Sequence, residues 1–210
     1  MSEATYSQML AAAILAFPVN HERKRANEAE FIAIRFESAS RKSFEEVIRL
    51  DPTRENAWEF LTVVTLIDQD LKKNLAVCQK RVQQKPSARN YYMLAKSHAE
   101  GEELDKAEAA LQRALIQDPK DFHANLGLAV LLLKKREGEP LKQAKVFLDR
   151  AQGLLPKDAP RMHQVDYALA RSVYHYLDGD APRAKRVLEK VVADDDDGQR
   201  ARALLDRLER

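Results

Sequence analysis

Glycine, proline and cysteine are scarce in this sequence. Its 210 residues include 6 glycines, 8 prolines and 1 cysteine. Sheet proteins draw on glycine and proline for their many turns, so this scarcity favours helices that are separated by a few fixed breaks. The single cysteine, Cys78, excludes an internal disulfide and a cysteine-rich zinc site.

An excess of charge of one sign is also missing. The formal net charge of +2 is too small to indicate nucleic acid or an anionic membrane as a partner. The apolar stretch from Met9 to Phe17 is too short to span a bilayer, and the residues before it do not resemble a secretion signal. We therefore expect a soluble, cytoplasmic protein with no membrane span and no nucleic-acid partner.

Motifs of catalysis and of metal binding are absent as well. The sequence contains no glycine-rich phosphate loop, no nucleophile elbow and no His-Glu-x-x-His. Its five histidines are dispersed, and the two that can share a surface, His123 and His163, have no identifiable further metal ligands. These absences predict a protein that is not an enzyme and that holds no cofactor and no metal.

The sequence does contain an internal repeat, which its prolines mark. Pro52, Pro86, Pro119 and Pro156 are 34, 33 and 37 residues apart. Before each proline, spacings of three and four place the packing residues of a helix on one stripe, and the proline then ends the helix. Read back from each proline in turn, these residues are Val47, Phe44 and Ser40; Arg81, Cys78 and Asn74; Ala114, Leu111 and Ala107; Ala151, Leu148 and Ala144. A fifth copy, with Ala184, Leu188 and Val191, ends at Asp196 instead of proline.

Another helix follows each proline, and this helix is the first of the next repeat. Its packing residues are Trp58, Leu61, Thr62 and Thr65; Tyr91, Leu94, Ala95 and His98; Asn125, Leu128, Ala129 and Leu132; Met162, Val165, Asp166 and Leu169. This pattern resembles the tetratricopeptide repeat, in which Trp-x2-Leu-Gly-x2-Tyr is followed by Ala-x3-Phe and then by proline. The resemblance covers roughly residues 20 to 196, and the copy from Tyr91 to Pro119 matches best.

The resemblance implies an all-α fold, a right-handed α-solenoid of antiparallel helical hairpins with about 11 helices. We expect one continuous domain. Residues 1–52 hold an N-terminal helix and a degenerate first repeat, four repeats follow at about 53–87, 88–121, 122–157 and 158–197, and residues 198–210 form a capping helix. His98 stands where the repeat motif has an aromatic residue, and Cys78 stands where other copies have a large apolar residue. Both are therefore predicted to be buried packing residues.

Departures from the repeat pattern predict local structure. Gly138 and Pro140 indicate a longer turn between the two helices of the fourth copy. Residues 162–177 form one lengthened helix, and Asp180 then caps the next helix, which has Pro182 in its first turn.

In tetratricopeptide-repeat proteins the first helices of the repeats line a concave wall that holds peptides or partner segments. The tryptophan position of the repeat motif is occupied by Trp58, Tyr91, Asn125 and Met162 in the four copies. The resemblance therefore implies a groove formed by the residues one, five and eight positions after each of these, which share a single helical face. Flanked by Arg89 and His123, these positions are Glu59, Val63 and Leu66; Tyr92, Lys96 and Ala99; Leu126, Val130 and Leu133; His163, Tyr167 and Ala170. Nine of these twelve are apolar, so we predict a scaffold or adaptor whose groove binds an apolar or amphipathic segment of a partner protein.

Two alternatives stay open. The apolar strip is either such a groove or simply core, and it can also be covered by the helix expected at residues 4–17. That expected helix has an apolar stripe of Tyr6, Met9, Leu10, Ala13, Ile14 and Phe17. If the stripe docks on a neighbouring copy, the chain is a self-assembling structural protein, a homo-oligomer held together by its N-terminal helix.

Overall fold

The computed structural model describes residues 39–51, 70–135, 138–192 and 196–208, together with residues 57, 58, 61, 62 and 65. All regular structure within these residues is helical, which confirms the predicted all-α fold. Nine helices lie in the described part, against about 11 expected. The helix expected at residues 4–17 lies outside it.

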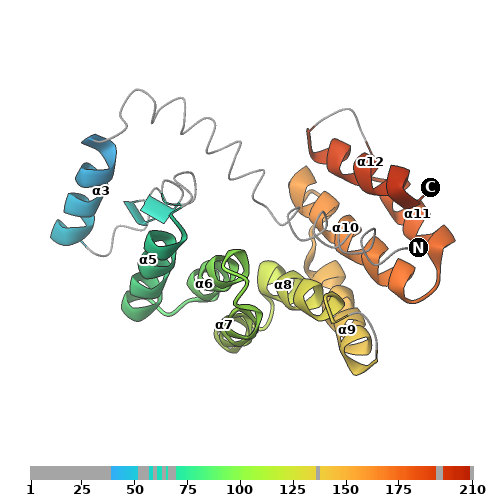
Figure 1. The fold of residues 1–210 in the computed structure, drawn as a ribbon, viewed down its shortest axis with the longest axis horizontal. Coiled ribbons are helices and arrows are strands. Elements are labelled where there is room, and N and C mark those ends of the chain that lie inside the picture. The colour runs from blue at the N-terminus through green and yellow to red at the C-terminus, as the bar shows by residue number, and fades with distance from the viewer. Residues whose placement is uncertain are drawn as a thin grey trace. The chain divides into compact units, whose positions relative to one another are not determined.

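The helices belong to two compact units. The unit that ends at Pro119 contains α3 (Ala39–Leu50), α5 (Leu71–Gln84), α6 (Ala88–Glu100) and α7 (Leu104–Gln117). The unit that includes Lys120–Arg210 contains α8 (Phe122–Leu133), α9 (Glu139–Leu154), α10 (Arg161–Leu177), α11 (Ala181–Glu189) and α12 (Asp196–Leu208) (Figure 1).

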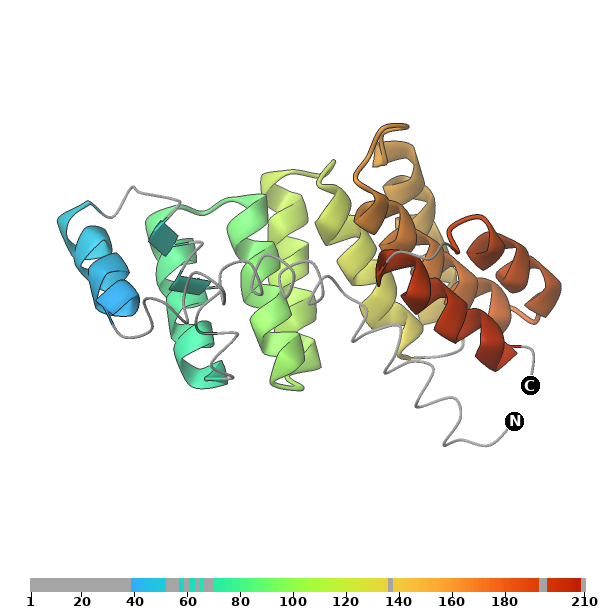
Figure 2. The same ribbon diagram turned by 90° about the horizontal axis from the view of Figure 1, so that it is seen from above.

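Neighbouring helices pack as hairpins within each unit. In the first unit α6 packs on α7 and on α5. In the second, α8 packs on α9 and α10 packs on α11, while α10 also contacts α8, α9 and α12 (Figure 2). Because the connections between consecutive helices are short, each pair runs antiparallel. These hairpins are the predicted building unit of the fold.

Prolines end four of the helices, as the repeat pattern predicts. The helices α3, α5, α7 and α9 each end two residues before a proline, at Leu50, Gln84, Gln117 and Leu154. Lys85, Asp118 and Leu155, which directly precede three of these prolines, have extended backbones. The proline ring clashes with a helical residue before it, so the helix has to stop there.

Side-chain caps begin several helices. Asp70, Ser87, Asp121 and Asp180 each accept a hydrogen bond from the backbone N–H three residues on, over 3.1, 3.3, 2.7 and 2.9 Å. Each cap satisfies a donor that has no partner inside the helix. The predicted cap at Asp180 is confirmed.

Small and large residues alternate in the helix interfaces. Ala107, Ala114, Ala144 and Ala151 are completely buried, and between them Leu111 and Leu148 are at most 3% exposed. An alanine lets two helix backbones approach, and the leucine then fills the space on either side of the crossing. These are the positions that were identified by counting back from each proline in the sequence.

In the copy that contains Trp58, the positions that hold alanine, leucine and alanine elsewhere are occupied by Asn74, Cys78 and Arg81, and a polar network forms there. Asn74 Nδ2 donates to the backbone oxygen of Thr62 and to Thr65 Oγ1, both over 3.0 Å. Arg81 Nη1 reaches Thr62 Oγ1 at 3.5 Å. Buried polar groups are tolerated when they find partners, so the polar residues on α5 match the threonines opposite.

The departures from the repeat pattern also have structural counterparts. The turn after α8 is longer, and Gly138, with φ of 72°, precedes α9 with Pro140 in its first turn. The helix predicted at residues 162–177 is α10, and Pro182 lies in the first turn of α11. Two bounds differ from expectation: α11 already ends at Glu189, and the capping helix begins at Asp196. Aspartates are favourable at a helix N-terminus, so a helix can begin within the acidic run.

Candidate partner-binding surface

The predicted inner-wall residues of α6 differ in how accessible they are. Arg89 is exposed and Ala99 is half-buried, whereas Tyr92 and Lys96 keep only 7% and 6% of their surfaces exposed. Tyr92, Lys96 and Ala99 are four and three residues apart and therefore share one helical face. On α6, the accessible part of the predicted surface is thus at the two ends of the strip.

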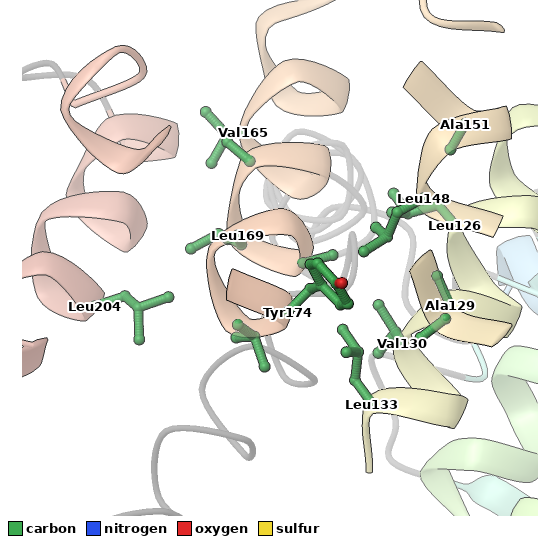
Figure 3. Packing of buried hydrophobic residues seen from close by; sticks show 14 of the residues in the cluster. Leu126, Ala129, Val130, Leu133, Leu148, Ala151, Val165, Leu169, Tyr174 and Leu204 are labelled. Atoms are coloured by element: carbon green, nitrogen blue, oxygen red, sulfur yellow. The ribbon is translucent and has the colours of Figure 1, made fainter. Parts of the chain in front are cut away.

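The inner-wall residues of α8 lie in the hydrophobic core of their unit. Leu126, Val130 and Leu133 are 4%, 6% and 2% exposed and belong to one buried cluster. Figure 3 shows Val130 and Leu133 near the ring of Tyr174, which projects from α10. This burial agrees with the alternative that the strip is core at α8, and a binding role for these three side chains stays a prediction. His123, at the start of α8, is half-buried.

The inner-wall residues of α10 are more accessible. His163 and Tyr167 are half-buried, while Ala170 is 3% exposed. Burial raises the pKa of the Tyr167 phenol, the nearby Arg171 guanidinium opposes this, and Asp149 adds to it. Tyr167 therefore stays a neutral phenol that offers a hydroxyl as well as a ring.

Three further predicted residues, Glu59, Val63 and Leu66, lie outside the described residues. Their assignment to the binding surface stays a prediction.

A cluster of three rings joins the first turns of α8 and α10. The ring centroids of His123 and His163 are 4.7 Å apart in an edge-on arrangement. Phe122 lies 5.3 Å from His123 and 5.5 Å from His163. The structure thus brings together the two histidines that were expected to share a surface. The sequence reasoning missed Phe122, whose only signal is its place directly before His123.

No metal centre forms around these rings in the part of the chain that the structure describes. Across the described ranges, no group of three or more histidine, cysteine, aspartate or glutamate side chains is arranged to hold an ion. Two imidazoles alone fall short of the three or four protein ligands that zinc usually takes.

A polar clasp between α9 and α10 was not predicted. Arg171 Nη1 donates to Asp149 Oδ1 over 2.6 Å, and the guanidinium lies 5.5 Å from the centroid of the Tyr174 ring. The Tyr174 hydroxyl donates to Asp178 Oδ2 over 3.2 Å. Burial and the Asp178 carboxylate raise the pKa of Tyr174. The available signal was the helical spacing of Tyr167, Arg171 and Tyr174 on one stripe of α10, with Asp178 directly after the helix.

Two packing predictions are confirmed. Cys78 is completely buried, and His98 is 8% exposed. His98 has an additional contact, because its Nδ1 lies 2.6 Å from Glu103 Oε2 in the turn before α7. Hydrogen bonds from Lys106 and from His98 lower the pKa of the Glu103 carboxyl. This pair fastens the turn between α6 and α7.

None of the helices in the described ranges has both the length and the apolar character that crossing a bilayer requires.

The central part of the sequence is similar to a known family. A family model described as tetratricopeptide repeat matches residues 92–159, from the first turns of α6 to the residue before Pro160. The match lies where the small and large slots follow the repeat pattern most closely. No curated protein sequence matches the chain.

Solved structures share the fold. A tetratricopeptide repeat protein from Parabacteroides merdae has a TM-score of 0.60 and 12% identity, over 98% of this chain and 74% of that one. A thermophilic tetratricopeptide-repeat protein from Thermus thermophilus has a TM-score of 0.62 and 18% identity, over 88% of this chain and 98% of that one. At such low identity the likeness is one of fold alone.

Proposed function

We propose that this chain, whose residues 92–159 match a tetratricopeptide-repeat family model, is a non-catalytic scaffold that binds an apolar or amphipathic partner segment along the first helices of its repeats. The predicted concave groove is the binding site. One observation carries the proposal, which is the partly exposed cluster of Phe122, His123 and His163. Tyr167 lies one turn beyond His163 on α10 and extends the cluster with a fourth ring.

Aromatic rings suit this role. Each offers a large contact area, has few rotatable bonds to restrict, and combines an apolar face with a polar edge. Such residues are enriched in the parts of interfaces that contribute most to binding. A partner segment with aliphatic side chains can pack between half-buried rings and bond to the phenol of Tyr167.

The buried residues of the predicted strip have a different part in the proposal. Leu126, Val130 and Leu133 hold α8 against its neighbours, so they set the positions of the rings that the partner meets. Within the unit that includes Lys120–Arg210, the partner would then contact His123, His163 and Tyr167.

A paired substitution tests the proposal. His163→Ala with Tyr167→Ala removes two rings from the surface, and we expect at least about a tenfold loss of the partner that the wild-type chain retains from the cells that make it. Quantitative mass spectrometry of the captured proteins measures that loss.

The matched control is Ile116→Ala on α7, an apolar residue that is 76% exposed and lies on a second helix of a repeat. It should retain the partner as the wild type does. Equal retention by the ring variant, with its circular dichroism unchanged, would show that the partner binds elsewhere.

A further inference from the structure

The ion pair between α9 and α10 lies beside the proposed binding surface. Arg171 follows Tyr167 by four residues on α10, so the two side chains lie on the same face of that helix. The charges of Arg171 and of Asp149 both act on the pKa of the Tyr167 phenol, which places the three polar groups close together. A partner that packs on Tyr167 therefore meets this ion pair as well.

The ion pair leaves hydrogen-bonding groups unused. Its one hydrogen bond joins Arg171 Nη1 to Asp149 Oδ1 over 2.6 Å. In the part of the chain that the structure describes, Oδ2 of Asp149, Nε and Nη2 of Arg171 and the hydroxyl of Tyr167 have no hydrogen-bond partner. None of these atoms is completely buried, and the Asp149 side chain is 49% exposed. The pair thus offers donors and an acceptor side by side to a molecule that binds there.

The charge of the pair favours a neutral, dipolar group. The guanidinium and the carboxylate compensate each other, so a charged side chain of a partner would be attracted by one and repelled by the other. An amide has a donor and an acceptor without a net charge, and it can satisfy both. Because the partner side chains that pack on the neighbouring rings are apolar, the amide is one of the partner's main chain.

The position of these two groups decides the conformation of that main chain. In an extended segment the N–H and the C=O of one residue point to the same side, as they do in a hydrogen-bonded pair of an antiparallel sheet. In an α-helix they bond within the helix, which leaves only N–H groups at one end and only C=O groups at the other. An extended segment can therefore offer both groups together, and a helix cannot.

We propose that the partner segment is extended and that Asp149 and Arg171 bind its main chain, with Asp149 accepting from the N–H and Arg171 donating to the C=O of one residue. This inference rests on the proposed function, because it assigns the partner's chemistry at the same surface. Side chains of an extended segment alternate between two sides, so every second one faces the rings of His163 and Tyr167.

A selected peptide tests the proposal on the full chain. Dodecapeptides are selected from a random library displayed on phage, and the probe is the tightest binder that the chain with His163→Ala and Tyr167→Ala no longer retains. We expect apolar residues at every second position of this probe. Apolar residues three and four apart, with a helical circular dichroism signal on binding, would overturn the inference and leave the proposed function standing. If the ring variant retains every selected peptide, the proposed function fails and the inference fails with it.

Ester bonds in the probe locate the main-chain contact. An ester in place of an amide removes the N–H without adding bulk. At one position this change should weaken binding to the wild type at least about tenfold, and binding to an Asp149→Ala chain by less than about twofold, because the acceptor is already gone. Fluorescence anisotropy measures the dissociation constants. An ester penalty that is equal on both chains, or absent at every position, would overturn the role of Asp149.

Glu139 provides a matched control on the same helix. Its carboxylate also pairs with a cation, Lys142, over 3.5 Å, but it lies in the first turn of α9 and its side chain is 68% exposed. The Glu139→Ala chain should keep the full ester penalty. If it loses the penalty as Asp149→Ala does, the effect is one of overall charge and the contact is refuted.

A side-chain amide of the probe is the competing source of the same chemistry. Replacing any asparagine or glutamine of the probe by alanine should leave the effect of Asp149→Ala on binding unchanged. If such a replacement abolishes the effect of Asp149→Ala and no ester does, the ion pair binds a side-chain amide, and the extended main chain is ruled out.

Discussion

At the scale of single residues, His175 is an ionisable group inside the fold. It lies on α10 and is 4% exposed. Burial lowers its pKa, and the positive charges of Arg183 and Arg171 lower it further. The folded state therefore holds this imidazole neutral at pH values where the unfolded chain begins to protonate it.

The sign of the resulting pH dependence follows directly. In the unfolded chain the pKa lies at the ordinary value of 6.5. At pH values above 6.5 the neutral imidazole of His175 makes its full contribution to the stability of the fold. That contribution is lost as the pH falls from 6.5 toward the lower pKa of the folded state. The thermal midpoint of the wild type should thus fall more between about pH 7.5 and about pH 5.5 than that of His175→Gln. Identical shifts in calorimetry would mean that His175 does not titrate differently on folding.

Two residues of α9 contrast a buried with an exposed aliphatic side chain. Leu148 is completely buried in the core, and Val146 on the same helix is 49% exposed. Leu148→Ala removes packed methyl groups and leaves a cavity, so it should lower the free energy of unfolding by about 2–5 kcal/mol. Val146→Ala should change it by no more than about 0.5 kcal/mol. Urea titration followed by circular dichroism compares them, and similar losses would contradict the assigned core.

Sequence reasoning identifies some buried residues and misses others for a physical reason. Ala144 and Leu148 were predicted because they recur at fixed offsets from a proline, and helical periodicity is a local property. The pair of Asp166 and Arg200 spans 34 residues of sequence and depends on how α12 lies on α10. Spacing alone does not show which charges meet. Of the ring cluster, His123 and His163 were foreseen, and Phe122 was not.

At the scale of helices, two local features define the end of α10 and the start of α11. Gly179 between them has φ of 85°, a conformation that favours glycine, and Asp180 caps α11 through the N–H of Arg183. The junction thus combines a glycine turn with a side-chain cap.

The cap can be tested with two substitutions of similar size. Asp180→Ala leaves the Arg183 N–H without its side-chain acceptor and should cost about 1 kcal/mol. Asp180→Asn keeps an acceptor oxygen, so most of the stability should remain. Chemical denaturation measures both. If alanine and asparagine cost the same, the hydrogen bond contributes little.

Glycines in different backbone conformations should respond oppositely to alanine. Gly179→Ala forces a side chain into the left-handed region and should cost about 1 kcal/mol. Gly153 lies within α9, where an added Cβ meets no other heavy atom within 4 Å. Gly153→Ala should therefore stabilise the protein by up to about 1 kcal/mol. Thermal midpoints of the two variants should move in opposite directions.

The sequence predicts a helix end where a residue such as proline cannot continue the helix. The ends before Pro86, Pro119 and Pro156 were foreseen because proline excludes the helical conformation from the residue before it. The end of α11 at Glu189 was not foreseen, since no proline follows and the sequence there still favours helix. The start of α12 within the acidic run was missed for a similar reason.

At the scale of the whole molecule, the chain has separate compact units, and the core of the second runs from Leu126 on α8 to Leu204 on α12. Repeat proteins are stabilised mainly by contacts between neighbouring helices, so damage in one place should remain partly local. In Leu148→Ala we expect hydrogen exchange to rise across α8 to α12 and to change much less in α5 and α6. A uniform rise across both units would indicate that the chain unfolds as one cooperative body.

The buried carboxylate of Asp166 also limits how such an array can grow. A hairpin duplicated and inserted after α11 would bring a new helix against α10, where it would meet the buried carboxylate of Asp166 in place of Arg200. A copy with a basic residue at the position of Arg200 would keep this ion pair, and one without it would lose the pair. Insertion after an earlier repeat would meet the uncharged Ala95 or Ala129 instead. Gene duplication can therefore lengthen the repeat array more easily after an earlier repeat than directly after α11.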